Sequence, residues 1–229
     1  MNFYIITLFP ESLKGYLNSS ILKRAAEKKL VKFFLINLRK FGVGKYRKVD
    51  DRPFGGGPGM VIKVEPVLKA VLFCLGYKKK KDLEKLLQYG EINFKKIKSK
   101  NTRIILFSTR GKVFNQKIAK RLAKYENLIL ICGHYEGVDE RVAKYIADEE
   151  ISIGNFVLSG GEIPALLVID ATSRQLPGVL GKYESLEDIK GSYPTYTRPF
   201  IFLKWKVPDV LLSGNHQKIK EWRKQNSKK

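Results

Sequence analysis

The stretch from Ile151 to Gly161, Ile-Ser-Ile-Gly-Asn-Phe-Val-Leu-Ser-Gly-Gly, constrains the fold more than any other part of the chain. It is too apolar for an ordinary surface loop and too rich in glycine for a regular strand or helix. Glycine lacks a side chain and tolerates positive φ angles, so a ligand or another backbone segment can approach closely. A second glycine-cornered turn, Cys132 to Gly137, also follows an apolar run. Either turn alone indicates a structural turn, whereas two of them, with Tyr135, Glu136 and Phe156 between the glycines, favour a binding site.

Short apolar segments alternate with helical patterns along the chain. Residues 2–7 form an apolar run, Pro10-Glu11 is typical of a helix start, and Ser19 or Ser20 can cap a second helix that reaches Lys29. Strand, helix, strand is the order that builds a sheet covered by helices, so the sequence predicts an α/β fold. Further strands are expected at 31–38, 103–107 and 128–131, and further helices at 66–75, 114–125, 163–176 and 217–224.

Small and polar residues follow three of the apolar segments, at 107–111, 133–137 and 153–161. In open α/β sheets, ligands bind at the carboxyl ends of the strands. We therefore expect these three segments to converge on one ligand site.

The chain is strongly basic, with 44 Lys and Arg against 22 Asp and Glu and a formal net charge of +22. Such a charge favours a polyanionic partner, either a nucleic acid or an anionic membrane surface. Lysine enrichment that reflects genome base composition is the alternative. The basic loop 45–59 lacks the Gly-Lys-Ser/Thr of a phosphate-cradling loop. Its Arg47, Lys48 and Arg52 either contact an RNA backbone or belong to a solvated surface loop.

The two cysteines, Cys74 and Cys132, stand among apolar residues without a metal-binding spacing, which indicates buried thiols and no zinc site. Residues 1–9 lack a basic leader region and a cleavage site, and no apolar run is long enough to span a bilayer. We therefore expect a cytoplasmic protein.

Three ordered segments carry a resemblance to a known family. They are Asp50 to Met60, Gly133 to Arg141 and Ser152 to Glu162, and the similarity runs from Leu8-Phe9-Pro10 to Leu212-Ser213-Gly214-Asn215-His216. These segments resemble the signatures of the bacterial TrmD-type tRNA (guanine-N1)-methyltransferases, which belong to the knotted SPOUT superfamily. The resemblance implies a mostly parallel Rossmann-like sheet with a deep trefoil knot that binds S-adenosylmethionine. It also implies a homodimer that makes 1-methylguanosine at tRNA position 37, after a preceding guanosine.

The same resemblance implies a division of the chain. Residues 1–180 would form the knotted cofactor-binding domain, 181–195 a flexible linker, and 196–229 a small basic helical tRNA-binding domain, shorter than in the family. The lysine-dense stretch 77–101 is read as an insertion.

Methylation at N1 of guanine requires a base for the N1 proton and a cation for the charge that develops on O6. By motif position, the resemblance assigns these roles to Asp188 and Arg174. The alternative for Arg174 is an intrahelical pair with Asp170, and for Asp188 a solvated acid or a helix cap. Glu136 either offsets the charge of the sulfonium, contacts a magnesium ion, or is a solvated turn acid.

The expected donor site combines apolar walls with accessible glycine backbone. Its predicted residues are Phe107, Ser108, Thr109, Gly111, Gly133, Tyr135, Glu136, Ile153, Gly154, Asn155, Phe156, Val157, Leu158, Gly160, Gly161 and Pro164. The predicted RNA contacts are Arg47, Lys48, Arg52 and Arg198. Asn155 and Phe156 replace an aspartate and a tyrosine of the usual pattern, which affects the detail of ligand contact.

Two other functions stay open on the sequence. One is a SPOUT enzyme with a different target, such as a ribose hydroxyl. The other is a non-catalytic RNA-binding protein in which the glycine turns are structural. Binding of S-adenosylmethionine would distinguish either enzyme from the RNA-binding protein. The identity of the modified nucleoside would distinguish the guanine-N1 enzyme from a SPOUT enzyme with a different target.

Overall fold

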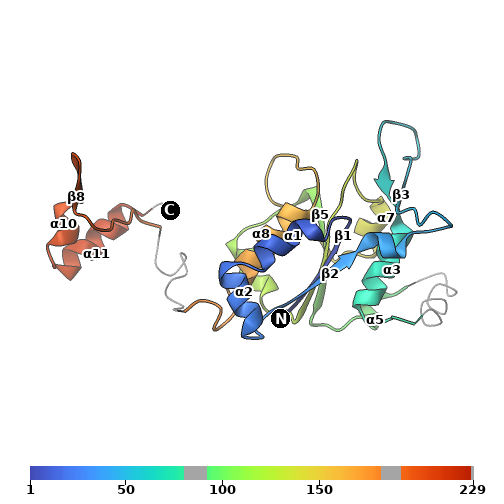
Figure 1. Cartoon of the computed structure of the whole chain (residues 1–229), viewed down its shortest axis with the longest axis horizontal. Coiled ribbons are helices and arrows are strands. Elements are labelled where there is room, and N and C mark those ends of the chain that lie inside the picture. The colour runs from blue at the N-terminus through green and yellow to red at the C-terminus, as the bar shows by residue number, and fades with distance from the viewer. Residues whose placement is uncertain (80–91, 182–191, 228–229) are drawn as a thin grey trace. The chain divides into compact units, whose positions relative to one another are not determined.

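The chain forms two compact units, Met1–Val179 and Leu180–Lys229. The structure is a computed structural model that describes residues 1–79, 92–181 and 192–227 (Figure 1).

The first unit is built on a five-stranded sheet in the order β2-β1-β6-β5-β7. All neighbouring strands run parallel, as in the pairing of Phe3 with Phe33 on one side and with Leu128 on the other. The predicted mostly parallel α/β sheet is therefore confirmed. The strands are β1 (Asn2–Thr7), β2 (Lys32–Asn37), β5 (Thr102–Val113), β6 (Asn127–Ile131) and β7 (Glu149–Ser152).

Helices cover both faces of this sheet, because successive strand side chains point to opposite faces and both sets are apolar (Figure 1). On β6, Leu128 packs in the core of one face and Ile129 in the core of the other. One face carries α1 (Glu11–Leu17), α2 (Ser20–Glu27), α6 (Gln116–Leu122) and α8 (Glu162–Ser173). The opposite face carries η1 (Leu38–Phe41), α3 (Val64–Cys74), the short α5 (Phe94–Ile97) and α7 (Glu140–Tyr145).

Side-chain caps fix two of the helix starts. Asn115 accepts a hydrogen bond from the backbone N–H of Ile118 at the start of α6, and Asp139 accepts one from Arg141 at the start of α7. The predicted helix at 114–125 is thus shorter, and it begins only after this cap. Helix α7 and strand β7 were not predicted, because each is short and carries acidic residues.

Strand β5 continues past its predicted end at residue 107 through a break in pairing. Phe107 and Lys112 both pair with Ile151 of β7, so residues 108–111 leave the ladder as a protruding loop. Gly111 makes this possible, since a Cβ there would lie 2.6 Å from the backbone nitrogen of Ile151. The irregularity places polar residues at the carboxyl end of the sheet.

A two-stranded antiparallel pair, β3 (Asp50–Asp51) and β4 (Val61–Ile62), flanks the glycine-rich segment that was predicted as a loop. The lysine-dense stretch 77–101 falls partly on residues 80–91, which lie outside the described part of the chain. The trefoil knot implied by the family stays a prediction. Across the described residues, no helix is both long and apolar enough to cross a membrane.

The described residues of the second unit form a hairpin and two helices. The hairpin pairs β8 (Ile201–Phe202) with β9 (Trp205–Lys206), and α10 (Asp209–Leu212) precedes α11 (His216–Gln225), which Asn215 caps. The helix predicted at 217–224 is confirmed, whereas the hairpin was not predicted. No described side chain of this unit is buried. A unit this small rarely builds a sufficient core of its own.

Candidate active site

One pocket of about 400 Å³ lies where the carboxyl ends of β5, β6 and β7 meet. Its walls come from residues 106–110, 133–138, 150–154 and 156–161, together with parts of α7 and the start of α8. The three segments expected to converge do so, as the rule for open α/β sheets requires. The size is that of a small-molecule ligand site.

All the predicted donor contacts line this pocket except Gly111 and Asn155. Gly111 serves the close packing of β5 on β7, and Asn155 is exposed on the loop. Their predicted donor contact therefore lacks support from the pocket. The lining residues that sequence reasoning did not assign are Leu106, Arg110, His134, Gly137, Val138, Glu140, Ala143, Glu150, Ile151, Ser152 and Ser159. His134 and Glu140 stand inside the recognised segment 133–141, and Arg110 stands in the expected loop 107–111. Glu150 belongs to β7, which was not predicted.

The two glycine-cornered loops are held together by backbone pairing. His134 and Gly160 form an antiparallel bridge, and the N–H of Gly161 donates to the carbonyl of Gly133 over 2.9 Å. A Cβ at Gly161 would lie 2.6 Å from the Cα of Cys132. The glycines at 160 and 161 thus permit contact between loops, rather than only close approach of a ligand. Tyr135 has a φ of +61°, a strained conformation for a residue with a side chain and one that clusters at binding sites.

A buried polar network lies beneath these loops. Glu162, the first residue of α8, accepts a hydrogen bond of 2.5 Å from the hydroxyl of Thr7, and its other oxygen lies 3.2 Å from Nε2 of His134. A Cβ at Gly160 would overlap Nε2 of His134 and lie 2.5 Å from Glu162. A bulky residue at Gly160 would therefore break this network as well as fill space at the pocket.

The pocket combines apolar side chains with charges of both signs. Val157 and Phe156 are largely exposed on one wall, at 84% and 54% of their surface. Elsewhere in the lining, Arg110 pairs with Glu140, and Oε2 of Glu150 is buried with no hydrogen-bond partner among the described residues. A buried carboxylate oxygen without a partner is costly unless a ligand donates to it. S-adenosylmethionine fits these residues, since it joins an apolar adenine to an amino-acid end that carries an ammonium and a carboxylate.

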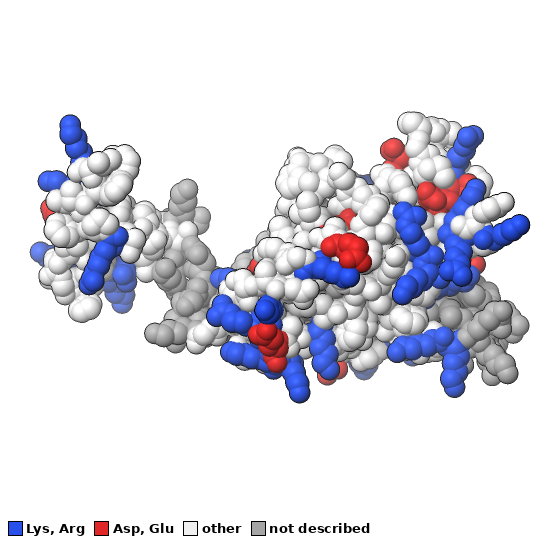
Figure 2. Space-filling view, viewed as in Figure 1, with Lys and Arg blue, Asp and Glu red and all other residues white. Residues whose placement is uncertain are grey.

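The basic loop is joined to the pocket rim. The N–H of Glu136 donates to the carbonyl of Met60 over 3.1 Å, and that of Ile62 donates to Gly137 over 2.9 Å. Glu136 is exposed, and a Cβ at Gly59 would lie 2.5 Å from its Oε1. The predicted RNA contacts Arg47, Lys48 and Arg52 are exposed in unit 1, and Arg198 is exposed in unit 2. Figure 2 shows Lys and Arg side chains gathered over α2 and around the β3 end of unit 1.

The structure does not bring Arg174 to the pocket of its own chain. Arg174 is the C-cap of α8, whereas Gly161 and Pro164 at the other end of this helix line the pocket. At 1.5 Å per residue, the two ends are about 20 Å apart. No ion pair joins Arg174 to Asp170 among the described side chains, and Asp170 instead accepts a hydrogen bond of 2.6 Å from Tyr16. Asp188 lies outside the described residues.

The cysteines are poor nucleophiles at neutral pH. Burial raises the pKa of Cys74 to about 12, and burial together with the charge of Glu162 raises the pKa of Cys132 well above its ordinary value. No group of three or more His, Cys, Asp or Glu that could hold a metal ion occurs in the described part of the chain.

Comparisons with known proteins agree on one family. The family model described as tRNA (Guanine-1)-methyltransferase TrmD matches residues 1–229. Proteins named tRNA (guanine-N(1)-)-methyltransferase from Carboxydothermus hydrogenoformans and Clostridioides difficile are 47% and 46% identical over 99% of this chain, and the matches cover 83% and 92% of those proteins. The crystal structure of a tRNA (m1G37) methyltransferase from Aquifex aeolicus is similar with a TM-score of 0.75 and 40% identity, covering 97% of this chain and 87% of that one.

Proposed function

The chain belongs to the tRNA (guanine-1)-methyltransferase family, and from this premise we propose that it methylates N1 of guanosine 37 in tRNA. The methyl donor is S-adenosylmethionine, and the products are 1-methylguanosine and S-adenosylhomocysteine. A tRNA substrate also agrees with the net charge of +22. A cytoplasmic location is part of the same proposal.

The pocket at the ends of β5, β6 and β7 carries this proposal. It combines apolar walls, glycine-cornered loops and charged groups of both signs within a chain that matches the family over its whole length. When bound, the donor supplies an electrophilic methyl group on a sulfonium. The protein must hold that group against N1 and keep water away from it.

The remaining chemistry belongs to the side chains. N1 of guanine carries a proton, which the carboxylate of Asp188 accepts as the bond from N1 to the methyl carbon forms and the sulfur–carbon bond breaks. Electron density moves onto O6 meanwhile, and the guanidinium of Arg174 donates a hydrogen bond to it. That bond strengthens toward the transition state, so it accelerates the reaction rather than only tightening binding. These two assignments rest on the motif positions of the residues.

We further propose that the active site is shared between two chains. Arg174 lies about 20 Å of helix away from the pocket of its own chain. Ile163 and Leu167 of α8 are 60% and 41% exposed, and together they form an apolar stripe on a helix that is otherwise mostly buried. If α8 packs antiparallel against its copy about a twofold axis, the end that carries Arg174 lies near the partner's pocket. Both side chains are exposed among the described residues, which supports burial against a second chain over the alternative of burial within one chain.

A magnesium ion is a secondary proposal. Glu136 is exposed on the pocket rim and is the carboxylate that would contact it. Isothermal titration of magnesium into the protein, with and without the donor, tests this contact. Loss of a donor-dependent magnesium signal in Glu136→Gln is the expected result, and an unchanged signal contradicts the assignment.

One assay tests the main proposal. Donor labelled in the methyl group is incubated with the protein and a tRNA transcript that carries guanosines at positions 36 and 37, and the tRNA is then digested to nucleosides. Label in 1-methylguanosine is expected, and a transcript with adenosine at position 37 should stay unlabelled. Label in a ribose-methylated nucleoside would favour a SPOUT enzyme that acts on a ribose hydroxyl. Donor binding without transfer to any tRNA would contradict the proposal. If neither donor binding nor transfer is seen, a non-catalytic RNA-binding protein is favoured.

A further inference from the structure

A second cavity, in unit 2, takes no part in the proposed methyl transfer. It is a groove of about 430 Å³ between the segment 193–200 and the helices α10 and α11. Tyr196 and Phe200, which are 50% and 61% exposed, line it, and Leu212 adds an aliphatic wall. No described side chain of this unit is buried, so these two rings are not packed into a hydrophobic core.

Two arginines line the same groove. The guanidinium of Arg223 stacks over the ring of Tyr193 at 4.8 Å, and Arg198 lies on the segment between Tyr196 and Phe200. None of the groove's lining residues, as far as the structure describes them, is acidic. Over 192–227 the sequence carries seven Lys and Arg against two acids. The groove therefore combines aromatic faces with uncompensated positive charge.

These features select one kind of occupant. Single-stranded RNA bases are bound by stacking on aromatic rings and arginine planes, while Arg and Lys hold the phosphates. An apolar peptide or a second copy of this unit would cover the rings but leave both arginines without an anion. The volume of the groove is ample for one nucleotide.

We propose that this groove binds one unstacked nucleotide of the tRNA, with the base against Tyr196 and Phe200 and the phosphate at Arg198 and Arg223. The inference rests on the proposed action on tRNA and adds the place where unit 2 holds that RNA. Trp222, whose ring centroid lies 6.3 Å from that of Tyr196, supports the tyrosine from outside the groove.

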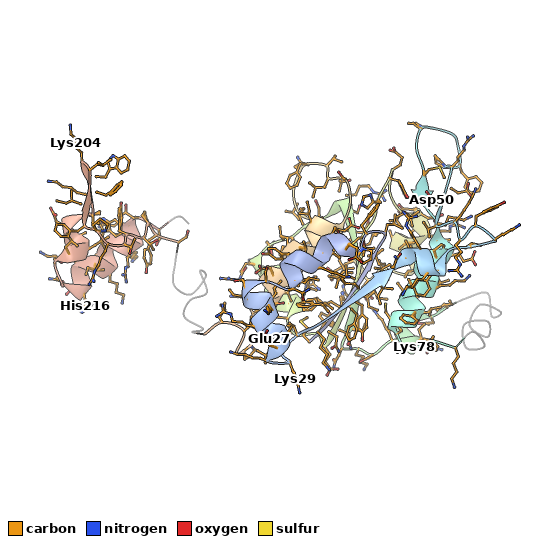
Figure 3. The ribbon with its side chains drawn as sticks, viewed as in Figure 1. Glu27, Lys29, Asp50, Lys78, Lys204 and His216 are labelled. Carbon is orange, nitrogen blue, oxygen red and sulfur yellow. The ribbon has the colours of Figure 1, made fainter. Side chains whose placement is uncertain are left out.

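The test measures the affinity of the full chain for the tRNA transcript at one fixed salt concentration. Phe200→Leu keeps apolar volume but removes the stacking face, so it should weaken binding about tenfold, and Phe200→Trp should bind like wild type. The matched control is Trp205→Leu on the hairpin, where the exposed side chains stand near Lys204 at the tip (Figure 3). Trp205 is 70% exposed and does not line the groove, so its change should alter affinity less than twofold.

A parallel pair tests the charge. Arg223→Gln should weaken binding and reduce the salt dependence of the affinity, whereas Lys224→Gln, which changes the next residue outside the groove, should do so less. Far-UV circular dichroism and thermal unfolding confirm that each variant keeps its fold.

Abasic substitutions at the unpaired positions of the transcript identify the bound nucleotide. Removing the base that occupies the groove should weaken wild type about as much as Phe200→Leu does, and the two changes together should cost no more than either alone.

Additive losses at all positions would overturn the proposal, as would equal losses in Phe200→Leu and Trp205→Leu. A change of oligomeric state in Phe200→Leu with unchanged tRNA affinity would mean that a protein covers the groove. Production of 1-methylguanosine by wild type is scored separately, so failure of the groove and failure of the proposed reaction are distinguishable.

Discussion

Nε2 of His134 lies 3.2 Å from Oε2 of Glu162, so the first residue of α8 holds a residue of the pocket loop 133–137. The other oxygen of Glu162 accepts from Thr7 at the end of β1. Because Glu162 is only 8% exposed, this carboxylate connects the sheet, the helix and the pocket wall in a place that water hardly reaches. The pocket therefore depends on a contact made below its surface.

Glu162→Gln should weaken donor binding and lower stability. The amide keeps an acceptor for Thr7 but removes the carboxylate that faces Nε2 of His134. A buried group left without its partner costs about 1–3 kcal/mol. Calorimetry of donor binding and thermal unfolding measure both effects. The matched control is Glu27→Gln, which changes an exposed acid on α2 and should leave both unchanged. Equal behaviour of the two variants would show that the network does not support the pocket.

The donor site is tested by a substitution on the loop 153–161. Leu158 lines the pocket and is half-buried, so Leu158→Arg should place a charge against the donor's apolar part and reduce its affinity by about a hundredfold. Asn155→Arg adds the same side chain to the same loop outside the pocket lining, and it should bind the donor like wild type. The measurement is titration calorimetry with S-adenosylmethionine. A larger loss in Asn155→Arg than in Leu158→Arg would mean that the pocket is not the donor site.

The sheet and the convergence of three loops were predictable because both follow local rules. Apolar runs such as 128–131 are buried strands, and turns after parallel strands meet at one edge. The pairing of Gly161 with Gly133 was not predictable, since a contact between distant loops has no local pattern. The position of Glu150 in the pocket was not predictable either, because the acidic sequence of β7 is not typical of a strand in a buried sheet. Glycines at 160 and 161 indicated close approach correctly, but the approaching groups include the protein's own backbone and side chains.

The catalytic assignment of Arg174 predicts a loss of rate rather than of stability. Arg174 makes no ion pair with Asp170 in the described structure, so Arg174→Ala should change the free energy of unfolding by less than about 0.5 kcal/mol. Single-turnover methyl transfer should fall by about a hundredfold or more, with donor affinity unchanged. Arg24→Ala on α2 is the control for removing an exposed arginine. Near-normal transfer by Arg174→Ala contradicts the assignment.

The environment of Glu149, the first residue of β7, predicts that the protein loses stability in acid. Burial alone would raise the pKa of Glu149, but hydrogen bonds from Arg121 and Arg103 outweigh it and lower the pKa below the ordinary value of 4.5. A depressed carboxyl pKa stabilises the fold fully above pH 4.5, and this stabilisation is lost as pH falls through the lower folded value. Arg121→Gln should therefore destabilise the protein by about 1 kcal/mol at pH 7 and by less in acid, since Arg121 is partly exposed and Arg103 still pairs with Glu149. Urea unfolding at several pH values measures this, and a difference that grows toward acid contradicts it.

Sharing of the active site between two chains predicts complementation. Leu158→Arg cannot bind the donor, and Arg174→Ala lacks the cation, so each should be inactive alone. In a heterodimer, the intact pocket of the Arg174→Ala chain meets the intact Arg174 of the other chain, and one complete centre forms. After free exchange of equal amounts, half of the dimers carry one centre of two, so activity should return to about a quarter of wild type. The control is a chain that carries both Leu158→Arg and Arg174→Ala. Because neither chain in its mixture with Arg174→Ala has the Arg174 side chain, that mixture should stay inactive. If the first mixture also stays inactive although heterodimers are shown to form, Arg174 acts on the pocket of its own chain.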